Sequence, residues 1–186
     1  MNIVVKTYSG ACIVRPDTTW EKDNADLYAP EFVEGLSFSP VLFARVSKPG
    51  RSVGERFASR YYDAVGCGVL LYPEEMLDGS ETGFARASCL DHTSFLPAPM
   101  SDKAVLGGEC SFRLFSSELL FYSADFSASM IESAIAEATK YIYLRIGDLV
   151  AVELDERRHL VSRSDGSVSV RGEFCGLTTS DFKIVL

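Results

Sequence analysis

Apolar and polar residues alternate over much of the chain, which predicts a protein built mainly from short β-strands. The segments that alternate in this way, or that are rich in β-branched and aromatic residues, are 11–14, 41–46, 68–71, 110–115, 119–122, 149–154 and 167–171. Runs of this length are typical of strands and are too short for core helices.

Only two segments carry the three- and four-residue spacing of a helix, residues 52–65 and 129–142. The first stops just before Gly66, and glycine commonly follows the last turn of a helix. The second opens with Ser129 and Glu132, which have the spacing of a capping box. Both helices are expected to pack on the strands.

The turn signals and the absence of linkers indicate one domain over residues 1–186. Residues 164–167, Ser-Asp-Gly-Ser, predict a hairpin between two strands. No Gly/Ser-rich or Pro-rich linker, low-complexity tract or fixed-period repeat divides the chain. Two helices among about ten strands predict a mostly β, α+β fold with a rolled sheet.

The charge balance makes nucleic acid and membrane surfaces poor candidates as partners. Eighteen Lys and Arg against 26 Asp and Glu give a net charge of −8, which repels phosphate backbones and anionic lipids. The apolar run at residues 3–5 ends at Lys6 and is too short for a signal peptide or a membrane span. A cytoplasmic location is therefore expected.

The five cysteines show no spacing that is typical of a zinc site or a redox motif. They are Cys12, Cys67, Cys89, Cys110 and Cys175. Disulfide frameworks normally occur in short, cysteine-dense secreted chains. We therefore expect all five to be buried, reduced thiols.

Few side chains form a pattern that indicates catalysis. His92 follows Asp91 and could act as an acid or base oriented by that carboxylate, although an exposed loop histidine beside a turn-forming Asp is the ordinary explanation. His159 lies in a charged turn, where solvation is the ordinary explanation. Glu74 and Glu75 could bind a divalent cation, but adjacent residues point in different directions and no third ligand is evident.

Several segments resemble the fumarylacetoacetate hydrolase family, in particular its short single-domain bacterial members. Residues 56–65 carry the most specific match. Residues 13–18 stand where the family has an apolar strand followed by Lys-Pro-Asp-Ser/Thr, and residues 30–32 follow at a matching distance. Residues 144–150 resemble the family's Leu-Lys-x-Gly-Asp-Leu-Ile turn into a strand. The resemblance covers residues 11–186 and implies a mixed β-roll or β-barrel.

The resemblance also implies a chemistry, and the sequence departs from it. Family members cleave or isomerise β-dicarbonyl and 2-oxo-enoate substrates, or decarboxylate oxaloacetate, with Mg²⁺ or Mn²⁺ held by three carboxylates. The corresponding positions here are Ser39, Val41 and Leu70. A hydroxyl and two apolar side chains are poor ligands for a hard cation. We therefore predict no metal and no other cofactor.

Other parts of the family's machinery are also replaced. Its Asn-Tyr-x-x-His-x-x-Glu lid segment has no counterpart before Arg15, so the N-terminal lid is expected to be shortened. Ser88 stands in place of the lysine before Gly-Phe-Asp, and residues 152–155 replace the Thr-Gly-Thr-Pro substrate loop. The former mouth of the site is expected to be partly closed. Its candidate polar remnants are Arg15, Arg45, Glu74, Asp91 and His92.

The leading interpretation is a non-catalytic homologue that acts as a binding or partner subunit. Homodimerisation is expected from the resemblance, and a full-length, active family relative is a second candidate partner. The alternative is a metal-independent hydrolase, isomerase or decarboxylase of small β-keto or 2-oxo acids, with Asp91 and His92 as catalytic residues and Arg15 or Arg86 binding a substrate carboxylate. A third interpretation is a residual metal enzyme that uses Glu74 or Glu75.

Overall fold

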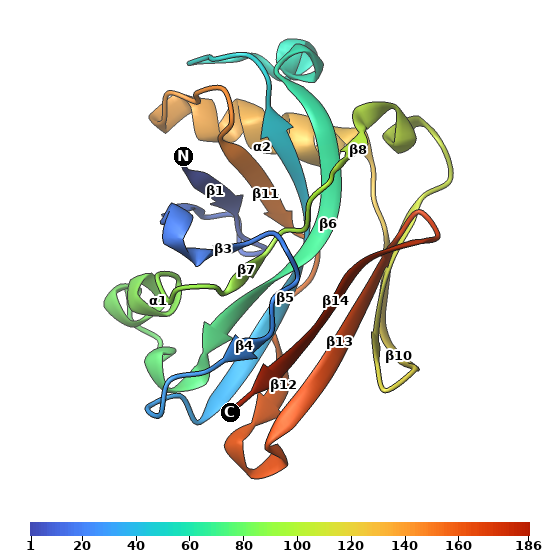
Figure 1. The fold of residues 1–186 in the computed structure, drawn as a ribbon. Coiled ribbons are helices and arrows are strands. Elements are labelled where there is room, and N and C mark those ends of the chain that lie inside the picture. Colours follow the sequence, from blue (N-terminus) through green and yellow to red (C-terminus); the bar gives the residue numbers. More distant parts are fainter.

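The computed structural model describes residues 1–186 and contains two β-sheets (Figure 1). The nine-stranded sheet has the order β2-β1-β11-β5-β6-β7-β3, with β12 also paired to β5 and β8 to β6. Its strands are β1 (Ile3–Lys6), β2 (Cys12–Arg15), β3 (Trp20–Glu21), β5 (Gly35–Val46), β6 (Tyr62–Pro73), β7 (Ser94–Phe95), β8 (Ser101–Asp102), β11 (Leu149–Glu153) and β12 (Arg158–Ser162).

The second sheet has five strands in the order β10-β9-β13-β14-β4. They are β4 (Leu27–Tyr28), β9 (Ser111–Ser116), β10 (Leu119–Asp125), β13 (Ser167–Phe174) and β14 (Leu177–Val185). The helices are α1 (Glu81–Ala87) and α2 (Ala128–Tyr141), and five 3-10 turns are η1 (Asp17–Thr19), η2 (Glu55–Arg60), η3 (Glu74–Met76), η4 (Lys103–Gly107) and η5 (Arg163–Asp165). In Figure 1, α2 lies at the top and α1 at the left.

The long strands β5 and β6 form the centre of the molecule and are buried on both faces. They pair antiparallel from Leu36↔Pro73 to Val46↔Tyr62, with one register shift near the Val46 end. Their alternate side chains enter two different apolar clusters. A strand that is covered on both sides needs apolar residues at consecutive positions, which explains the nearly continuous hydrophobic runs in the sequence.

We call the two clusters the outer core and the inner core. The outer core contains 31 buried residues from both sheets and α2, among them Phe38, Phe112 and Phe174. The inner core contains ten buried residues, namely Ile3, Val5, Val41, Phe43, Leu70, Tyr72, Ala87, Leu96, Leu149 and Ala151. The nine-stranded sheet therefore separates two packed layers of unequal size.

The predicted fold class is confirmed, because the chain is mostly β with a few helices and its main sheet is curled (Figure 1). All seven predicted strands are present. Four of them are longer than predicted, since β5 begins at Gly35, β6 begins at Tyr62, β10 ends at Asp125 and β13 ends at Phe174.

The predicted helix at residues 52–65 is wrong. This region holds only the 3-10 turn η2, and β6 begins two residues after it, at Tyr62. Pairing with β5 buries Tyr62, Ala64 and Val65, and this burial outweighs the local helical spacing of the apolar residues. Val53 is still buried in the outer core, whereas Phe57, which the helical spacing also placed on the buried face, is 40% exposed.

The second predicted helix is confirmed as α2, which buries Ile131, Ile135 and Ala138. Its predicted capping box is wrong, because the N-cap is Ser127, whose side chain makes no cap hydrogen bond, and Ser129 lies inside the helix. The predicted hairpin at residues 164–167 is wrong, because that turn joins β12 of one sheet to β13 of the other and the two strands do not pair. Helix α1 was not predicted from the sequence; its N-cap Ser80 accepts a hydrogen bond from the Gly83 N–H.

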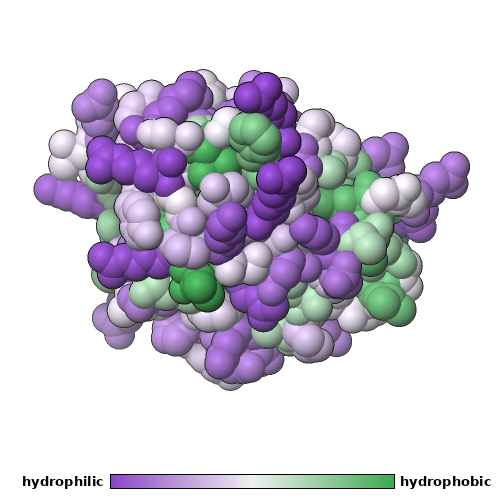
Figure 2. Space-filling model, turned by 90° about the horizontal axis from the view of Figure 1, so that it is seen from above, coloured by the Kyte–Doolittle hydropathy of each residue, from purple (hydrophilic) through white to green (hydrophobic).

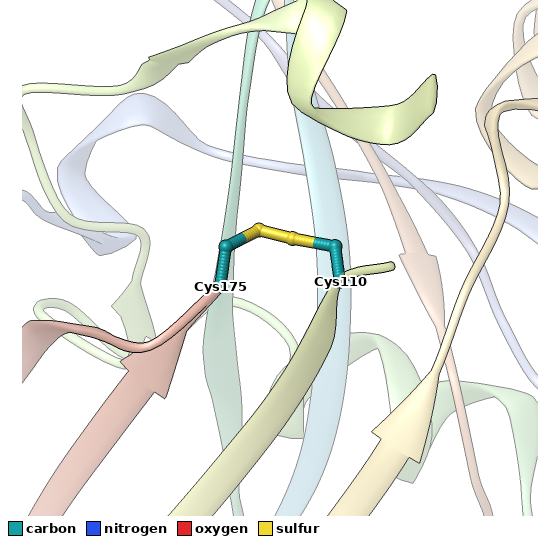
Figure 3. Close-up of a disulfide and its surroundings, with 2 residues drawn as sticks. All are labelled: Cys110 and Cys175. Carbon is teal, nitrogen blue, oxygen red and sulfur yellow. A yellow bond between two sulfur atoms is a disulfide. The ribbon is translucent and has the colours of Figure 1, made fainter. Parts of the chain in front are cut away.

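The cysteines do not all have the predicted reduced form. Cys110 and Cys175 form a disulfide that links the start of β9 to the turn between β13 and β14 (Figure 3). Their separation of 65 residues gave no spacing signal in the sequence. Cys12, Cys67 and Cys89 are free; Cys67 is buried, whereas Cys89 is exposed. The expectation of five buried, reduced thiols therefore holds in full only for Cys67, because Cys12 is reduced but only partly buried.

Hydrophilic side chains cover most of the face in Figure 2, and the hydrophobic residues there form small separate patches. This face lies over the end of the molecule that carries α2 in Figure 1. None of the helices has the length and apolar character needed to cross a membrane.

Candidate functional site

The three positions that the resemblance equates with metal ligands lie together on the inner face of the nine-stranded sheet. Ser39 on β5 is paired with Leu70 on β6, and Val41 lies two residues further along the same face of β5, opposite Gly68. Ser39, Val41 and Leu70 are each 0% exposed. The sheet register thus assembles the positions as neighbours, and their side chains are packed into the inner core.

These residues do not fit a hard divalent cation. The three positions offer one hydroxyl oxygen, Ser39 Oγ, and two hydrocarbon side chains, whereas Mg²⁺ and Mn²⁺ are bound by several oxygen ligands. The chain contains no group of three or more His, Cys, Asp or Glu side chains arranged to hold a metal. Two carboxylates close together in an apolar core repel each other, and apolar residues at these positions avoid that cost.

A fully buried arginine lies in the same inner layer. Arg15, at the end of β2, places its guanidinium 4.9 Å from the ring centroid of Tyr72. Its Nη2 donates to the Leu71 carbonyl at 3.1 Å and to Thr93 Oγ1 at 2.6 Å. Burial lowers the pKa of Arg15 from its ordinary value, because the charged form loses its hydration. The arginine stays charged, since an arginine pKa is too high for deprotonation in a folded protein.

Tyr72 connects this arginine to a buried carboxylate. The Tyr72 hydroxyl donates to Glu153 Oε1 at 2.8 Å, and the Tyr8 N–H donates to Glu153 Oε2 at 2.9 Å. Tyr72 is 0% exposed and Glu153 is 6% exposed. Burial raises the pKa of Tyr72 above its ordinary value, so the phenol stays protonated and remains a donor to Glu153.

Three buried polar atoms in this layer have no hydrogen-bond partner. They are Arg15 Nε, Arg15 Nη1 and Ser39 Oγ. Arg15 also makes no ion pair, and the two oxygens of Glu153 accept instead from Tyr72 and Tyr8. Leaving a buried charged donor unpartnered is costly. The inner layer therefore has unsatisfied capacity to hold an anion or an acceptor.

The structure separates the other predicted site residues. Asp91 and His92 are exposed, and the carboxylate that His92 Nδ1 meets, at 3.4 Å, belongs to Glu21. The predicted orientation of His92 by Asp91 is therefore wrong, because the chain folds β3 against this loop and brings Glu21 to the imidazole. Arg86 lies on the exposed side of α1, whereas Arg15 is buried.

A second polar cluster lies at the rim, where β5 begins and β6 ends. Glu74 Oε1 accepts from the Ser37 hydroxyl and lies 2.9 Å from His159 Nδ1. Glu75 instead accepts from the backbone N–H of Glu34. Because the carboxylate lies between the serine and the histidine, this arrangement does not give a histidine-activated serine.

Tyr72, Glu153 and Thr93 were not predicted from the sequence as members of the inner layer. Glu153 carried a usable signal, because it is an ionisable residue at the end of the apolar run 149–152, where an isolated carboxylate needs a partner. Arg45, which was expected near the mouth of the site, is half-exposed and paired with Asp63 through two hydrogen bonds.

Comparison with known proteins identifies the fold. No protein-family model and no curated protein matches this sequence. A Yersinia pestis protein of the fumarylacetoacetate hydrolase family superposes with a TM-score of 0.83 at 15% identity, over 99% of this chain and 92% of that one. Fumarylpyruvate hydrolase from Pseudomonas aeruginosa, solved with Mn²⁺ and pyruvate, gives 0.83 at 13% identity over 100% and 90%.

A third similar structure is 2-hydroxyhepta-2,4-diene-1,7-dioate isomerase from Mycobacterium marinum, with a TM-score of 0.80 at 18% identity over 99% of this chain and 74% of that one. The chain therefore has the fold of the fumarylacetoacetate hydrolase family, as the sequence resemblance implied. The similar structures include both hydrolases and isomerases. Identities this low establish the shared fold and leave the reaction to be argued from the site.

Proposed function

We propose that this protein is a non-catalytic relative of the fumarylacetoacetate hydrolase fold enzymes and acts as a binding or partner subunit. One observation carries the proposal: Ser39, Val41 and Leu70 are adjacent, fully buried and without a carboxylate. A metal-dependent reaction needs oxygen ligands that these three positions do not supply. The inner layer nevertheless keeps polar capacity at Arg15, which suits binding better than metal-assisted cleavage.

The test is a Mn²⁺ and Mg²⁺ titration by calorimetry, together with turnover assays on a panel of β-keto and 2-oxo acids. The positive control is the P. aeruginosa fumarylpyruvate hydrolase, whose structure contains Mn²⁺. We expect no stoichiometric metal binding and no metal-dependent turnover. One equivalent of Mn²⁺ bound per chain, with turnover that EDTA abolishes, would refute the proposal.

A metal-independent reaction on small β-keto or 2-oxo acids is the alternative, and Arg15 is the observation that favours it, since a guanidinium binds carboxylates well. The same panel in EDTA tests this alternative. Turnover that Arg15→Lys reduces and His92→Ala leaves unchanged would support an active site at Arg15. A rate that both variants leave unchanged would place the activity elsewhere.

The partner is proposed to be a second copy of this chain or a full-length relative of the same fold. Shared folds can form shared interfaces, and a subunit without metal ligands could then regulate an active one. Size-exclusion chromatography with light scattering, for the protein alone and mixed with such a relative, checks both options. A monomer in each case would contradict the partner role.

A further inference from the structure

The charged residues of the chain are distributed very unevenly. Residues 45–60 and 140–146 carry seven Lys and Arg and one acidic residue, Glu55, which gives these two segments a balance of +6. The rest of the chain carries the other 11 Lys and Arg and 25 Asp and Glu, a balance of −14. The net charge of −8 therefore conceals a positive region.

The two basic segments lie side by side at the end of the molecule that carries α2. Gly50 and Leu144 form an antiparallel bridge, with backbone N–H to carbonyl distances of 3.1 and 3.0 Å. The Ser52 N–H donates to the Thr139 carbonyl at 2.8 Å, and η2 packs against α2. In Figure 1 this region lies at the top, and Figure 2 shows it from above as strongly hydrophilic side chains around small hydrophobic patches. We call the surface formed by these two segments the basic end.

Most cations of the basic end have no carboxylate partner. Arg45 is paired with Asp63, and Lys140 with Glu137. The other five basic side chains are exposed and form no ion pair within the chain; they are Lys48, Arg51, Arg56, Arg60 and Arg145. These five charges are therefore available to an anionic partner.

Exposed apolar side chains are interleaved with these cations. Four of the twelve exposed large hydrophobic side chains of the protein lie in the basic end, namely Phe57, Tyr141, Tyr143 and Ile146. The guanidinium carbons of Arg56 and Arg60 lie 4.6 and 5.4 Å from the centroid of the Phe57 ring, so charge and ring form one continuous surface. Arginine and aromatic side chains are enriched at protein–protein interfaces.

We propose that the basic end binds an acidic segment of a partner protein, one that also carries aromatic side chains. The unpaired cations supply electrostatic complementarity to such a segment, and the exposed rings supply apolar contact. The inference rests on the proposed role as a binding or partner subunit, and it names the surface used and the chemistry of the partner.

Other anionic partners fit the distribution of charge less well. A nucleic acid or an anionic membrane extends beyond the basic end, where the balance of −14 on the rest of the chain repels it. Two basic ends repel each other, and a basic end against an acidic surface of a second copy is a head-to-tail contact that gives no closed dimer. A symmetric dimer of this chain would have to use another surface.

The first experiment measures binding of the fluorescein-labelled peptide Glu-Glu-Phe-Glu-Glu-Phe-Glu-Glu by fluorescence anisotropy. Replacing its phenylalanines by serine keeps the charge alone, and replacing its glutamates by lysine reverses the charge. We expect the acidic aromatic peptide to bind at least about tenfold more tightly at about 50 mM than at about 300 mM NaCl, because salt screens exposed charges. It should also bind more tightly than the serine peptide. Absence of binding at low salt, or equal binding of the lysine peptide, would overturn the inference.

Charge reversal with a matched control locates the surface. Arg56→Glu combined with Arg60→Glu changes two exposed residues and should weaken binding of the acidic aromatic peptide at least about tenfold. Arg113→Glu combined with Lys183→Glu changes the net charge equally at exposed positions of the five-stranded sheet, and should weaken binding by less than about threefold. Equal weakening by the two double variants would mean that net charge alone controls binding, and the basic end would lose its role.

The contribution of the ring is tested separately with Phe57→Ser. This variant should weaken binding of the phenylalanine peptide and leave the serine peptide unchanged, whereas Leu119→Ser, which removes an exposed apolar side chain elsewhere, should affect neither. Equal weakening of both peptides by Phe57→Ser would contradict the apolar part of the inference.

Two further measurements distinguish the other partners. A labelled oligouridylate that binds more tightly than the acidic aromatic peptide would replace the protein segment by a nucleic acid. Light scattering that shows low-salt oligomers, which Arg56→Glu with Arg60→Glu abolishes, would replace it by a second copy. Either result would overturn the inference while leaving the metal titration unchanged, so the inference and the proposed loss of metal-dependent catalysis fail separately.

Discussion

The two faces of the nine-stranded sheet differ in what they bury besides hydrocarbon. The outer core is packed by aromatic pairs, including Phe95 stacked on Phe182 with ring centroids 3.7 Å apart. The inner core is smaller and adjoins Arg15, Glu153 and the unpartnered hydroxyl of Ser39. Buried polar groups that reduce stability are often kept at functional sites. The outer face is thus packed with hydrocarbon throughout, whereas the inner face retains buried polar groups, which the proposed binding function would explain.

The largest expected effect tests whether the inner face is as tightly filled as the outer face. Leu70 and Leu71 are neighbours on β6, both 0% exposed, and they point to the inner and outer cores respectively. Leu70→Asp and Leu71→Asp should each lower the free energy of unfolding by more than about 4 kcal/mol or prevent folding, because each buries a carboxylate without a partner. Urea denaturation monitored by circular dichroism measures both.

Leu120→Asp is the matched control, because Leu120 is 55% exposed and should change stability by less than about 0.5 kcal/mol. A Leu70→Asp protein that is stable while Leu71→Asp unfolds would mean that the inner face is open to water. Such a result would remove the basis for regarding the metal site as lost.

The second prediction concerns the covalent link within the five-stranded sheet. Removing the disulfide with Cys110→Ser and Cys175→Ser should cost about 2–4 kcal/mol, because it closes a long loop in the unfolded chain. Thiol titration with Ellman's reagent gives an independent check. The native protein should show Cys89 reacting rapidly and Cys12 more slowly, with Cys67 reacting only after unfolding.

Burial also raises the pKa of the Cys67 thiol well above its ordinary value, which further slows its reaction. The unfolded protein should therefore show three reactive thiols before reduction and five after it. Five thiols in the unreduced protein would contradict the link.

The third prediction compares one hydroxyl on each face. Tyr72→Phe removes the donor to the buried carboxylate of Glu153 and should cost about 1–3 kcal/mol. Tyr122→Phe, in the outer core, removes a hydroxyl that makes no hydrogen bond within the chain and should change stability by less than about 0.5 kcal/mol. Equal losses from the two variants would show that the polar network on the inner face is not needed for stability.

The contribution of the Tyr72–Glu153 hydrogen bond to stability depends on pH with a definite sign. Burial raises the pKa of Tyr72 in the folded state, so the contribution of the protonated phenol is fully present below the ordinary tyrosine value near pH 10. It decreases as the pH rises above that value, because the unfolded tyrosine then ionises first. Unfolding midpoints measured from pH 8 to 11 should fall less steeply in Tyr72→Phe than in the parent protein.

The strands could be predicted from the sequence because burial on a sheet requires apolar residues at the positions that face the core, and this requirement leaves a local pattern. The sequence also placed Ser39, Val41 and Leu70 at one site, which the register of β5 and β6 confirms as a cluster. It could not predict that Arg15 meets Tyr72, or that His92 meets Glu21, because these pairs join elements 57 and 71 residues apart. Contacts of this kind depend on the path of the chain, and local periodicity carries no information about that path.

The smallest expected effect is at Arg45, which lies on the same face of β5 as Ser39 and Val41 but is half-exposed. Hydrogen bonds from Arg45 lower the pKa of Asp63, so the stabilisation is present above the unfolded carboxyl value near pH 4 and is lost as the pH falls through the lower folded value. Arg45→Gln should raise the Asp63 titration midpoint, measured by NMR of its carboxyl carbon, and cost less than about 1 kcal/mol at pH 7. A cost near that of Tyr72→Phe would mean that the polar network extends to the surface, whereas a small cost confines it to the buried layer around Arg15.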